Sequence, residues 1–549
     1  MLFGLDRASI RQRCKPPANY GHIPRWKGQK LLGCGDSGIS YSVPYGKPDI
    51  SDNGLGGYVN TSKRELSNSS FCKGLIEGRW QSASSGSTFP VYEPASDIVL
   101  LDCSNFSRQD IQRAILSANA AQKNFYISTT AAQRGKLLRA WYDLILANKE
   151  DLATILTLEN GKVIAEARSE VEYAASFVSW FAEEATRSYG DIIPSSTPGE
   201  TVFTIKEPVG VCGIITPWNF PAAMITRKVA PALAAGCSVV VKPPSETPFT
   251  ALALAQLAVR AGIPATCVQV VPTKDRAAAS ELASSHIIKK LSFTGSTEVG
   301  KYLSTLAAKT VKKMSMELGG NAAFIVFDDA DLDLAVKGAM QSKFRATGQT
   351  CVCANRLFVH ASVVDEFARR LTEQVRQLKL GFGLEENVTQ GPLVNKLSVE
   401  KVAGHVRDAL DHGGELLFGG NRPSYLGNGY FFEPTIIKNA TIDMAVAHEE
   451  TFGPLAAIFS FRDEQEVIRL ANSTPFGLAS FFLSRDLHRA LRLANALEAG
   501  MIGVNTGAIS AAETPFGGIK ESGFGREGSK YGLEEYQVIK SVTIGSMEA

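Results

Sequence analysis

Apolar residues recur with the period of an α-helix over most of residues 107–187. This spacing predicts two amphipathic helices in succession. Their apolar positions are Ile111, Ala114, Ile115 and Ala118 in the first, and Leu137, Leu138, Trp141 and Leu144 in the second. Helical spacing continues over residues 152–187 and is interrupted at Asn160-Gly161, a pair that favours a turn. This part of the chain is therefore predicted to be a set of helices.

The pattern changes at residues 190–210, where a turn rich in Pro, Ser and Gly precedes an apolar run at 202–205. A β-hairpin fits this order of turn and strand residues. Residues 536–544 alternate like an edge strand, and an exposed edge favours pairing with another subunit. We therefore expect residues 190–210 and 530–549 to form a small β oligomerisation element.

From residue 211 onward, short apolar runs alternate with amphipathic segments. Such alternation predicts parallel sheets covered by helices on both faces. In a first block we expect strands at 211–215, 238–242, 267–272 and 288–294, and helices at 222–235, 249–261 and 297–308. In a second block we expect strands near 322–327, 356–360 and 501–505, and helices near 330–347, 363–378 and 397–412. The blocks meet near 317–321, where we expect a cleft for a cofactor and a substrate.

Residues 1–70 differ from the rest in pattern and in charge. Pro, Gly and Ser punctuate them without a periodic apolar pattern, so we expect a disordered, basic leader. They carry a net charge of +5, whereas the remaining 479 residues carry −3, so the whole chain of 549 residues has a charge of +2. A total so near zero argues against a protein whose whole surface binds nucleic acid or anionic lipid.

The sequence has neither a secretory signal nor a convincing membrane span. The longest uncharged stretch, 208–226, is broken by Pro208, Pro217 and Pro221. The chain has 9 Cys, an odd number and too few for a disulfide scaffold, which favours a reducing compartment. The basic start is compatible with an organellar transit peptide, and equally with a disordered tail or a misassigned gene start. We expect the cytoplasm or the mitochondrial matrix.

Three glycine motifs resemble nucleotide-binding loops. Residues 33–38 and 523–528 match G-x-G-x-x-G, but neither follows a predicted strand and opens a helix, as a dinucleotide site requires. Residues 295–302 follow a strand and differ by one residue from a P-loop, whose last position is a Ser or Thr that binds Mg²⁺. Tyr302 is too long for that role, so a nucleoside triphosphatase is the less favoured interpretation. Gly295 and Ser296 still lie at a strand-to-helix junction suited to the phosphates of another nucleotide.

Three residues in separate motifs are suited to nucleophilic catalysis. Cys351 follows a predicted helix between small residues, where a thiol can be exposed near backbone N–H groups, and a nucleophile also needs a lowered pKa. Glu317, between apolar residues and a Gly pair, should have a raised pKa and can act as a general base. Asn219, in a loop fixed by two Pro residues, can donate its amide to an oxyanion. Taken singly, they would be a structural Cys, a paired acid and a turn residue.

Together these residues resemble the aldehyde dehydrogenase superfamily. The motifs TPWNFP, VVKP, FTGS, ELGG, GQTC, EETFGP and PFGG occur in the order of that family, and the resemblance extends from about residue 75 to 545. It implies an α/β fold with two Rossmann-like domains and the small β oligomerisation element. The NAD(P)-binding domain would comprise residues 71–189 and 211–316, and the catalytic domain residues 317–529.

The resemblance also implies a role for each residue. Cys351 would attack the aldehyde, Asn219 and the Cys351 N–H would stabilise the oxyanion of the thiohemiacetal, and hydride would pass to a nicotinamide. Glu317 would then activate water to hydrolyse the thioester, and Lys228 matches a family lysine near the active site. The implied cofactor-binding residues are Trp218, Lys242, Ser245, Gly295, Ser296, Glu450 and Phe452.

Cofactor preference can be inferred from Ser245, three residues after Lys242. Family members that prefer NAD often have Glu at this position, where it holds the ribose and repels a 2′-phosphate. A neutral hydroxyl removes that repulsion and Lys242 can pair with the phosphate, although Glu246 follows directly. We therefore expect NADP to be accepted, alone or alongside NAD.

Arg227, Arg345 and Ser510 indicate the substrate. This set resembles that of the succinate-semialdehyde dehydrogenases within the family, in which two Arg and a Ser bind the far carboxylate, in 4-aminobutyrate degradation. Guanidinium groups in an apolar tunnel suit an anionic guest, although one Arg could instead form a structural ion pair. The alternatives are an enzyme for another carboxylated aldehyde such as glutaric semialdehyde, and a non-catalytic protein on the same fold.

Cys353 lies two residues after Cys351, and the resemblance implies that a disulfide between them would block the nucleophile. Simple packing is the other role for Cys353. A C-x-C pair without a second pair supports a zinc site poorly, and we expect no metal. The expected partners are a small aldehyde and further copies of the chain in a homodimer or homotetramer, without nucleic acid or membrane.

Overall fold

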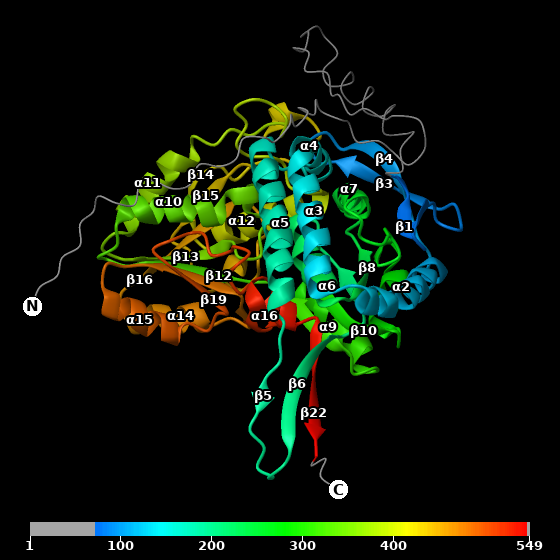
Figure 1. Ribbon diagram of the computed structural model, residues 1–549. Helices are drawn as coiled ribbons and strands as arrows, with labels where there is room; N and C mark the ends of the chain where they lie inside the picture. Colours follow the sequence, from blue (N-terminus) through cyan, green and yellow to red (C-terminus); the bar gives the residue numbers. More distant parts are fainter. Residues whose placement is uncertain (1–71, 546–549) are drawn as a thin grey trace, which may run out of the picture. The chain divides into compact units, whose positions relative to one another are not determined.

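The structure is a computed structural model that describes residues 72–545, in which two large β-sheets carry the fold (Figure 1). The first sheet has 8 strands in the order β2-β1-β9-β8-β7-β10-β11-β21. These strands are β1 (Gly74–Ile76), β2 (Arg79–Gln81), β7 (Val211–Ile215), β8 (Ser238–Lys242), β9 (Val268–Val270), β10 (Ile288–Thr294), β11 (Lys313–Glu317) and β21 (Gly523–Phe524). Strands β7 to β11 run parallel, and β1 and β21 join them antiparallel. The leader and the glycine motif at 33–38 lie outside the described residues.

Helices cover both faces of the first sheet (Figure 1). The helices in this part are α2 (Arg108–Ser128), α3 (Ala131–Ala147), α4 (Lys149–Asn160), α5 (Ile164–Glu184), α6 (Ala223–Ala235), α7 (Pro248–Arg260), α8 (Arg276–Ser284) and α9 (Thr297–Ala308). Apolar residues of α2, α8 and α9 form one core cluster with Val211 and Ile215 of β7. Helix α6 is buried along its whole length, and α3 and α5 pack against it. The first sheet is therefore buried on both faces, as its continuous apolar strands predicted.

The second sheet has 7 strands in the order β14-β15-β16-β13-β12-β18-β19. They are β12 (Ala322–Val326), β13 (Ala354–His360), β14 (Glu415–Phe418), β15 (Thr435–Lys438), β16 (Leu455–Phe461), β18 (Ala479–Leu483) and β19 (Met501–Val504). Its helices are α10 (Leu332–Lys343), α11 (Val364–Val375), α12 (Lys396–Asp411), α14 (Glu464–Asn472) and α15 (Leu487–Ala496). Alternate residues of β12 point into two different core clusters, one with α10 and α11 and the other with α12, α14 and α15. Both faces of this sheet are buried as well.

The alternation of strands and helices confirms the α/β prediction, with differences at some boundaries. Strands β7, β8 and β10 and helix α9 begin and end at the predicted residues. The break at Asn160-Gly161 is present, because Gly161 ends α4 in the left-handed conformation with φ 83°. The helix predicted at 330–347 is shorter, since Ala346 and Thr347 have φ values of 50° and 55° that no α-helix can contain.

Several strands were not predicted, among them β11, β15, β16, β18 and the hairpin of β3 (Thr88–Glu93) with β4 (Ile98–Ser104). Strands β16 and β18 are continuous apolar runs that are buried at nearly every position. The spacing of apolar residues alone cannot distinguish such a strand from a buried helix segment. The strands follow from the neighbours with which they pair in the second sheet.

Three strands extend away from the two large sheets (Figure 1). They are β5 (Ile192–Ile193), β6 (Thr201–Pro208) and β22 (Gln537–Ile544), which pair antiparallel in the order β22-β6-β5. This confirms the predicted hairpin and adds that β22 pairs with β6 of the same chain over its whole length. Ile192 and Ile539 are exposed on this small sheet. In residues 72–545, every helix is too short or too polar to cross a bilayer.

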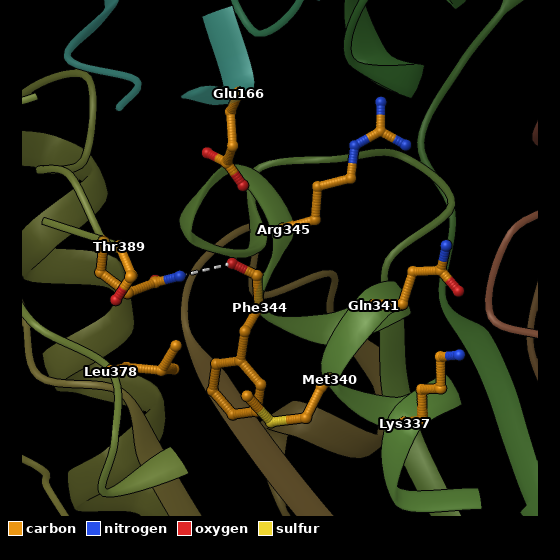
Figure 2. Close-up of a pocket in the computed structure, with 9 residues that line it drawn as sticks. Glu166, Lys337, Met340, Gln341, Phe344, Arg345, Leu378 and Thr389 are labelled. Atoms are coloured by element: carbon orange, nitrogen blue, oxygen red, sulfur yellow. Dashed lines mark hydrogen bonds between the residues drawn. The ribbon is translucent and has the colours of Figure 1, made fainter. Parts of the chain in front are cut away.

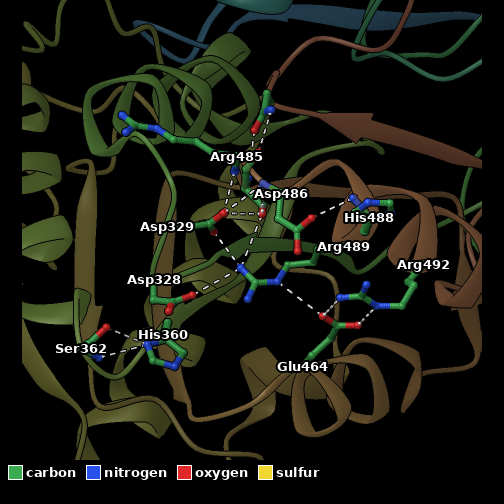
Figure 3. Close-up of polar contacts among 12 residues, drawn as sticks. Asp328, Asp329, His360, Ser362, Glu464, Arg485, Asp486, His488, Arg489 and Arg492 are labelled. Carbon is green, nitrogen blue, oxygen red and sulfur yellow. Dashed lines mark hydrogen bonds and ion pairs between the residues drawn. The ribbon is translucent and has the colours of Figure 1, made fainter.

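A half-buried carboxylate occupies the carboxyl edge of the second sheet, near the ends of β12 and β18 (Figure 3). Asp329 Oδ2 accepts from the N–H groups of Arg485 at 2.8 Å and Asp486 at 3.1 Å and from the Ser484 hydroxyl at 2.9 Å. Arg489 donates to its other oxygen at 2.8 Å. Ligands of open α/β sheets bind at this edge, where helix N-termini attract anions. Asp329 accepts those donors here, so this part of the edge is occupied by a carboxylate of the chain itself.

Candidate active site

Cys351 lies in the loop between α10 and β13. The chain turns there through Ala346, Thr347 and Gly348, three consecutive residues with positive φ. Gly348 is required by space as well, because a Cβ on it would collide with the carbonyl oxygen of Gly453. Thr347 Oγ1 donates to Gly391 O at 3.1 Å, which ties the turn to a neighbouring segment. This tight turn is the structural reason for the small residues that surround Cys351 in the sequence.

The Cys351 thiol is half-buried and surrounded by the charges of three other candidate residues. Burial raises the pKa of Cys351 to about 12, Glu450 and Glu317 add to the rise, and Arg227 opposes it. A lowered pKa is the usual requirement for a nucleophilic thiol, and burial shifts the pKa of Cys351 in the opposite direction. The thiol is protonated at neutral pH, so a base has to remove its proton before it can attack.

Glu317 ends strand β11 and is paired across the sheet with Gly523. Its side chain is buried, and neither carboxylate oxygen has a hydrogen-bond partner within residues 72–545. Burial, followed by the charge of Glu527, holds the pKa of Glu317 well above its usual value, while Lys228 and Arg227 act against the rise. The raised pKa confirms the prediction made from its apolar neighbours. An unpaired carboxylate of this kind is suited to accept a proton.

Glu527 is a buried residue of the site that the sequence argument missed. It pairs with Lys228 and, at 2.7 Å, with the Nε of Arg227, so one carboxylate binds two consecutive cations of α6. Glu527 lies in the glycine motif at 523–528, which was set aside because it fails as a nucleotide loop. The motif's one acid, between Arg526 and Gly528, was a signal of a functional residue that could have been followed.

Asn219 is buried in the loop between β7 and α6. Its Oδ1 accepts from the N–H of Phe220 at 3.1 Å, and its Nδ2 donates to Gln349 O at 3.0 Å, two residues before Cys351. The amide nitrogen therefore has a second N–H available. The contact links the Asn219 loop to the Cys351 loop and supports the predicted position of Asn219 beside the nucleophile.

Two aromatic rings and an acid gather at the same end of the site. The rings of Trp218 and Phe452 meet edge to face with centroids 5.5 Å apart. Glu450 Oε1 accepts from Gly320 N at 3.2 Å, and burial raises the pKa of Glu450 to about 7. Phe452 has φ 54°, so the backbone of this loop is strained in order to present its ring.

The predicted phosphate-binding residues lie at the carboxyl ends of β8 and β10, in the parallel part of the first sheet. Lys242 ends β8 without an ion-pair partner among residues 72–545, and burial lowers its pKa, while Glu246 opposes that shift. Ser245 Oγ donates to Glu246 Oε2 at 3.1 Å. Ser296 is the N-cap of α9 and its side chain makes no capping bond, and Gly295 precedes it. An unpaired cation and an open helix N-terminus fit a dinucleotide's phosphates.

The P-loop interpretation of residues 295–302 does not fit this geometry. Lys301 pairs with Glu521 at 3.0 Å on the surface, and Tyr302 is exposed. The lysine therefore points away from the junction at Gly295, where a phosphate would have to lie for this motif to act as a P-loop.

Arg345 lines an open pocket of about 440 Å³ (Figure 2). Its side chain is exposed, lies over the Phe220 ring at 4.9 Å from the centroid, and forms no ion pair within the described part of the chain. Met340, Phe344 and Leu378 supply the apolar wall of the pocket. Arg345 is therefore a cation with its charge available to an anionic ligand.

Arg227 has a different environment from Arg345. It is buried between the rings of Phe516 and Phe177, with its guanidinium carbon 4.1 Å and 5.0 Å from their centroids. It forms the ion pair with Glu527, so the structural role that sequence reasoning left open is real. Its Nε faces Glu527 without forming a hydrogen bond, and its Nη2 is also buried without a hydrogen-bond partner in residues 72–545. Nη2 therefore stays free for a ligand.

Ser510 forms a hydroxyl–hydroxyl hydrogen bond with Tyr173 of α5, another residue that sequence reasoning missed. The charge of Arg227 interacts with Tyr173, so Tyr173 links two of the predicted substrate residues, Arg227 and Ser510. Only the helical spacing of α5 pointed to Tyr173, and that spacing does not mark a polar contact.

Cys353 is buried, and neither it nor Cys351 forms a disulfide within the described residues. The Lys343 ammonium lies 3.4 Å from Cys353 Sγ. Burial raises the pKa of Cys353, and Lys343 acts in the opposite direction. The redox role of Cys353 stays a prediction.

Comparison with known proteins agrees with this site. The model of the aldehyde dehydrogenase family matches residues 80–542. "Succinate-semialdehyde dehydrogenase [NADP(+)] 1" of Schizosaccharomyces pombe is 52% identical over 476 residues, which is 86% of this chain and 95% of that protein. "3-Sulfolactaldehyde dehydrogenase" of Pseudomonas putida is 54% identical over 86% of this chain and 97% of its own length. A crystal structure of succinate-semialdehyde dehydrogenase from Burkholderia pseudomallei has a TM-score of 0.85 and 53% identity, over 86% of this chain and 98% of its own. The chain belongs to the aldehyde dehydrogenase family.

Proposed function

We propose that the chain oxidises succinic semialdehyde to succinate with NADP or NAD. The observation that carries the proposal is Arg227, a buried cation whose charge acts on Cys351 and whose Nη2 lacks a hydrogen-bond partner in residues 72–545. A buried donor without a partner is costly. A substrate carboxylate held at a fixed distance from the thiol would satisfy it.

The first step takes place at Cys351. Because burial raises the pKa of its thiol to about 12, the proton has to pass to a base. The Glu317 carboxylate is suited to take it, because its charge acts on the thiol and its oxygens have no other partner in the described chain. The sulfur then bonds to the aldehyde carbon. The new oxyanion accepts from Asn219 Nδ2 and from the Cys351 N–H, which stabilises the developing charge.

A bound nicotinamide cofactor supplies the acceptor for the hydride that leaves the thiohemiacetal carbon, and a thioester remains on Cys351. The residues that would hold its phosphates and adenosine are Lys242, Ser245, Gly295 and Ser296, and those on the nicotinamide side are Trp218, Glu450 and Phe452. The unpaired charge of Lys242 and the open N-terminus of α9 support this assignment. The first sheet would then be the NAD(P)-binding domain.

Hydrolysis completes the reaction. Glu317 first passes the proton from Cys351 to solvent and then takes a proton from water. The hydroxide attacks the thioester carbon and the C–S bond breaks to release succinate, whose new carboxyl group loses its proton to solvent. Glu317 then returns its proton to the Cys351 thiolate. Lys228 and Glu527 support this step because their charges set the proton affinity of Glu317. Burial lowers the pKa of Lys228 and Glu527 opposes that shift, and the two side chains form a buried ion pair.

The far carboxylate of the substrate would bind Arg227, Arg345 and Ser510. Arg345 forms no ion pair in the described chain, and the Ser510–Tyr173 hydroxyls add donors next to Arg227. Guanidinium groups bind a carboxylate with two parallel hydrogen bonds, which fixes the length of the guest. Glutaric semialdehyde, one carbon longer, and a sulfonated aldehyde are the competing substrates, because relatives named glutarate-semialdehyde dehydrogenase and 3-sulfolactaldehyde dehydrogenase are 53% and 54% identical to this chain.

A spectrophotometric assay of reduced nicotinamide tests the proposal. Succinic, glutaric and sulfonated aldehydes and the uncharged butanal are each combined with NAD and with NADP. We expect the largest kcat/KM with succinic semialdehyde, and a large preference over butanal. A preference for another anionic aldehyde would correct the substrate. No turnover with any of them would support a non-catalytic protein on this fold.

Assembly into a homodimer or homotetramer is part of the proposal. The sheet β22-β6-β5 exposes Ile192, Val538 and Ile539, and β5 is a free edge in the described chain. Exposed apolar side chains beside a free edge favour contact with another copy. Light scattering coupled to size-exclusion chromatography gives the mass of the assembly. Ile539→Lys should lower that mass, because it places a charge on the surface that would contact another copy.

The compartment is the cytoplasm or the mitochondrial matrix. Residues 1–70 fall outside the described chain, so their predicted role as a leader is tested separately. A fusion of these residues to a fluorescent protein would collect in mitochondria if they are a transit peptide. It would spread through the cytoplasm if they are a disordered tail.

A further inference from the structure

A buried lysine contacts the loop that carries Asn219. Lys162 lies between α4 and α5, and it pairs with Glu170, with only 2% and 1% of the two side chains exposed. The ammonium also donates to Asn219 O at 2.9 Å and lies 3.9 Å from the centre of the Phe220 ring. Charges buried this deeply are costly unless their contacts are complete. The main chain of Asn219 is therefore held in one position by a fully buried cation.

Glu170 binds the next residues of the same loop. Its Oε1 accepts from the N–H groups of Ala222 at 2.9 Å and Ala223 at 3.4 Å. These N–H groups belong to the first turn of α6, where a carboxylate is favoured by the helix dipole. Helix α6 carries Arg227 and Lys228 further along. The ion pair thus fixes both the Asn219 loop and the start of the helix that follows.

Two further side chains of the same corner hold the adjoining backbone. Asn160 Nδ2 donates to Trp218 O at 2.9 Å, and Glu166 Oε1 accepts from Ala346 N at 2.8 Å. Ala346 belongs to the tight turn before Cys351, and Figure 2 shows Glu166 beside that turn. The corner between α4 and α5 therefore contacts both loops from which the oxyanion donors come.

We propose that the Lys162–Glu170 pair is a positioning device for the oxyanion step. It holds Asn219 so that its second amide N–H is directed at the carbonyl oxygen of an aldehyde attacked by Cys351. Donors of this kind act only when they are aligned before the charge develops, and a misplacement of about 1 Å costs about 100-fold in rate. The inference rests on the proposed function, and the pair acts through Asn219 rather than by touching the substrate.

The test compares Lys162→Met with Lys290→Met. Lys290 is a matched control because it is fully buried too, and it pairs with Glu535 at 2.9 Å and with Ser315, outside the site. Both variants leave a carboxylate without its cation and should melt at a lower temperature. Only Lys162→Met should slow the pre-steady-state burst of reduced nicotinamide, by about 10- to 100-fold. The loss should be equal for succinic semialdehyde and butanal, with an unchanged Kd for the cofactor.

A conservative variant separates position from charge. Glu170→Gln keeps an acceptor for Ala222 N and for Lys162, so it should retain most of the burst rate. A burst in Lys162→Met within about 3-fold of the wild type, or an equal loss in Lys290→Met, would overturn the proposal.

If the proposed function is wrong, another reaction at Cys351 still tests the positioning role of Lys162. If the wild type reduces neither cofactor with any aldehyde, the same variants are compared in the hydrolysis of p-nitrophenyl acetate by Cys351. That acyl transfer forms an oxyanion at the same sulfur without a cofactor. A loss confined to Lys162→Met supports the positioning role, and equal rates in all three proteins overturn it.

Discussion

Gly320 lies against the backbone of Cys351, so closely that a Cβ on Gly320 would stand 2.5 Å from the carbonyl oxygen of Cys351. Its own N–H donates to Glu450 at 3.2 Å, and it follows Glu317 by three residues. One residue therefore joins the strand with the candidate base to the loop with the nucleophile. The glycine is needed here for space rather than for a left-handed backbone.

Replacing Gly320 by Ala should displace Cys351 and lower kcat by about 100-fold, since backbone atoms cannot yield as a side chain can. Gly319→Ala is the matched control. A Cβ there would meet only side-chain atoms, Thr297 Oγ1 at 3.2 Å and Glu450 Oε2 at 3.4 Å. We expect a loss of less than about 10-fold for it. Steady-state kinetics at a temperature where both proteins are folded measures the difference, and equal losses would contradict the argument.

The raised pKa of Glu317 predicts a dependence of activity on pH. Only its carboxylate form can accept a proton, so kcat/KM should rise with pH as this group loses its proton, at a pH well above the ordinary value of about 4.3. Profiles between about pH 5 and pH 9 for the wild type and Glu317→Gln measure it, and the variant should lose the rise. A flat wild-type profile would count against Glu317 as the base.

The variant Glu527→Gln tests whether Glu317 is the group whose titration causes this dependence on pH. The charge of Glu527 is the second cause of the raised pKa of Glu317, after burial. Without that charge the pKa of Glu317 falls, so the rising limb should move to lower pH. A limb that moves upward or stays in place would show that another group is titrating.

The elements that sequence reasoning located correctly are those whose pattern is local. Strands β7, β8 and β10 are short apolar runs bounded by turns, and Gly161 ends α4 because only a residue tolerant of φ 83° fits there. Cys351, Glu317 and Asn219 stood out because their neighbours are small, apolar or proline. Each of these signals lies within a few residues of the position that it marks.

The features that could not be predicted depend on residues far apart in the chain. Glu527 is 299 positions from Lys228, and no local pattern indicates that they pair. The raised pKa of Cys351 comes from burial and from Glu450, 99 residues later, rather than from its own motif. Arg227 matched a substrate-binding pattern, but its ion pair with Glu527 became visible only in three dimensions.

Asp329 should contribute to stability through the N–H groups it accepts from at the start of α15. Asp329→Ala removes this shared acceptor and its contact with Arg489, and we expect a loss of about 2 kcal/mol in the free energy of unfolding. Asp328→Ala is the control, because Asp328 makes one exposed ion pair with Arg489 at 3.3 Å and should cost about 0–1 kcal/mol. Urea unfolding of both variants measures the values. Equal losses would contradict the capping role.

The stabilising effect of Asp329 should also depend on pH. Burial alone would raise the pKa of Asp329, but hydrogen bonds from Ser484 and Arg485 and the charge of Arg489 lower it. A lowered folded-state pKa gives stability that is complete above the unfolded value, about 3.9, and is lost as the pH falls through the folded value. The difference between the wild type and Asp329→Ala should therefore shrink on acidification.

Arg345→Ala should affect charged and uncharged substrates differently. Loss of one partner of a carboxylate contact costs about 2–4 kcal/mol, which lowers kcat/KM for succinic semialdehyde by about 30- to 1,000-fold. Butanal has no carboxylate and should change by less than about 3-fold. Lys337→Ala removes another exposed cation that lines the same pocket and should change neither substrate. Equal losses with both aldehydes in Arg345→Ala would refute carboxylate recognition.

Ser245→Glu should change the cofactor preference. A carboxylate at this position would face the 2′-phosphate of NADP, and such like-charge contact costs several kcal/mol, so kcat/KM with NADP should fall by at least about 30-fold. NAD lacks that phosphate, and its ribose hydroxyls could donate to the new Glu, so its kcat/KM should hold or rise. Ser245→Ala is the control: it removes the hydroxyl that donates to Glu246 at 3.1 Å without adding charge, and the preference should barely move. A wild type that uses NAD at least as well as NADP, with a ratio that Ser245→Glu leaves unchanged, would show that this position does not select the cofactor.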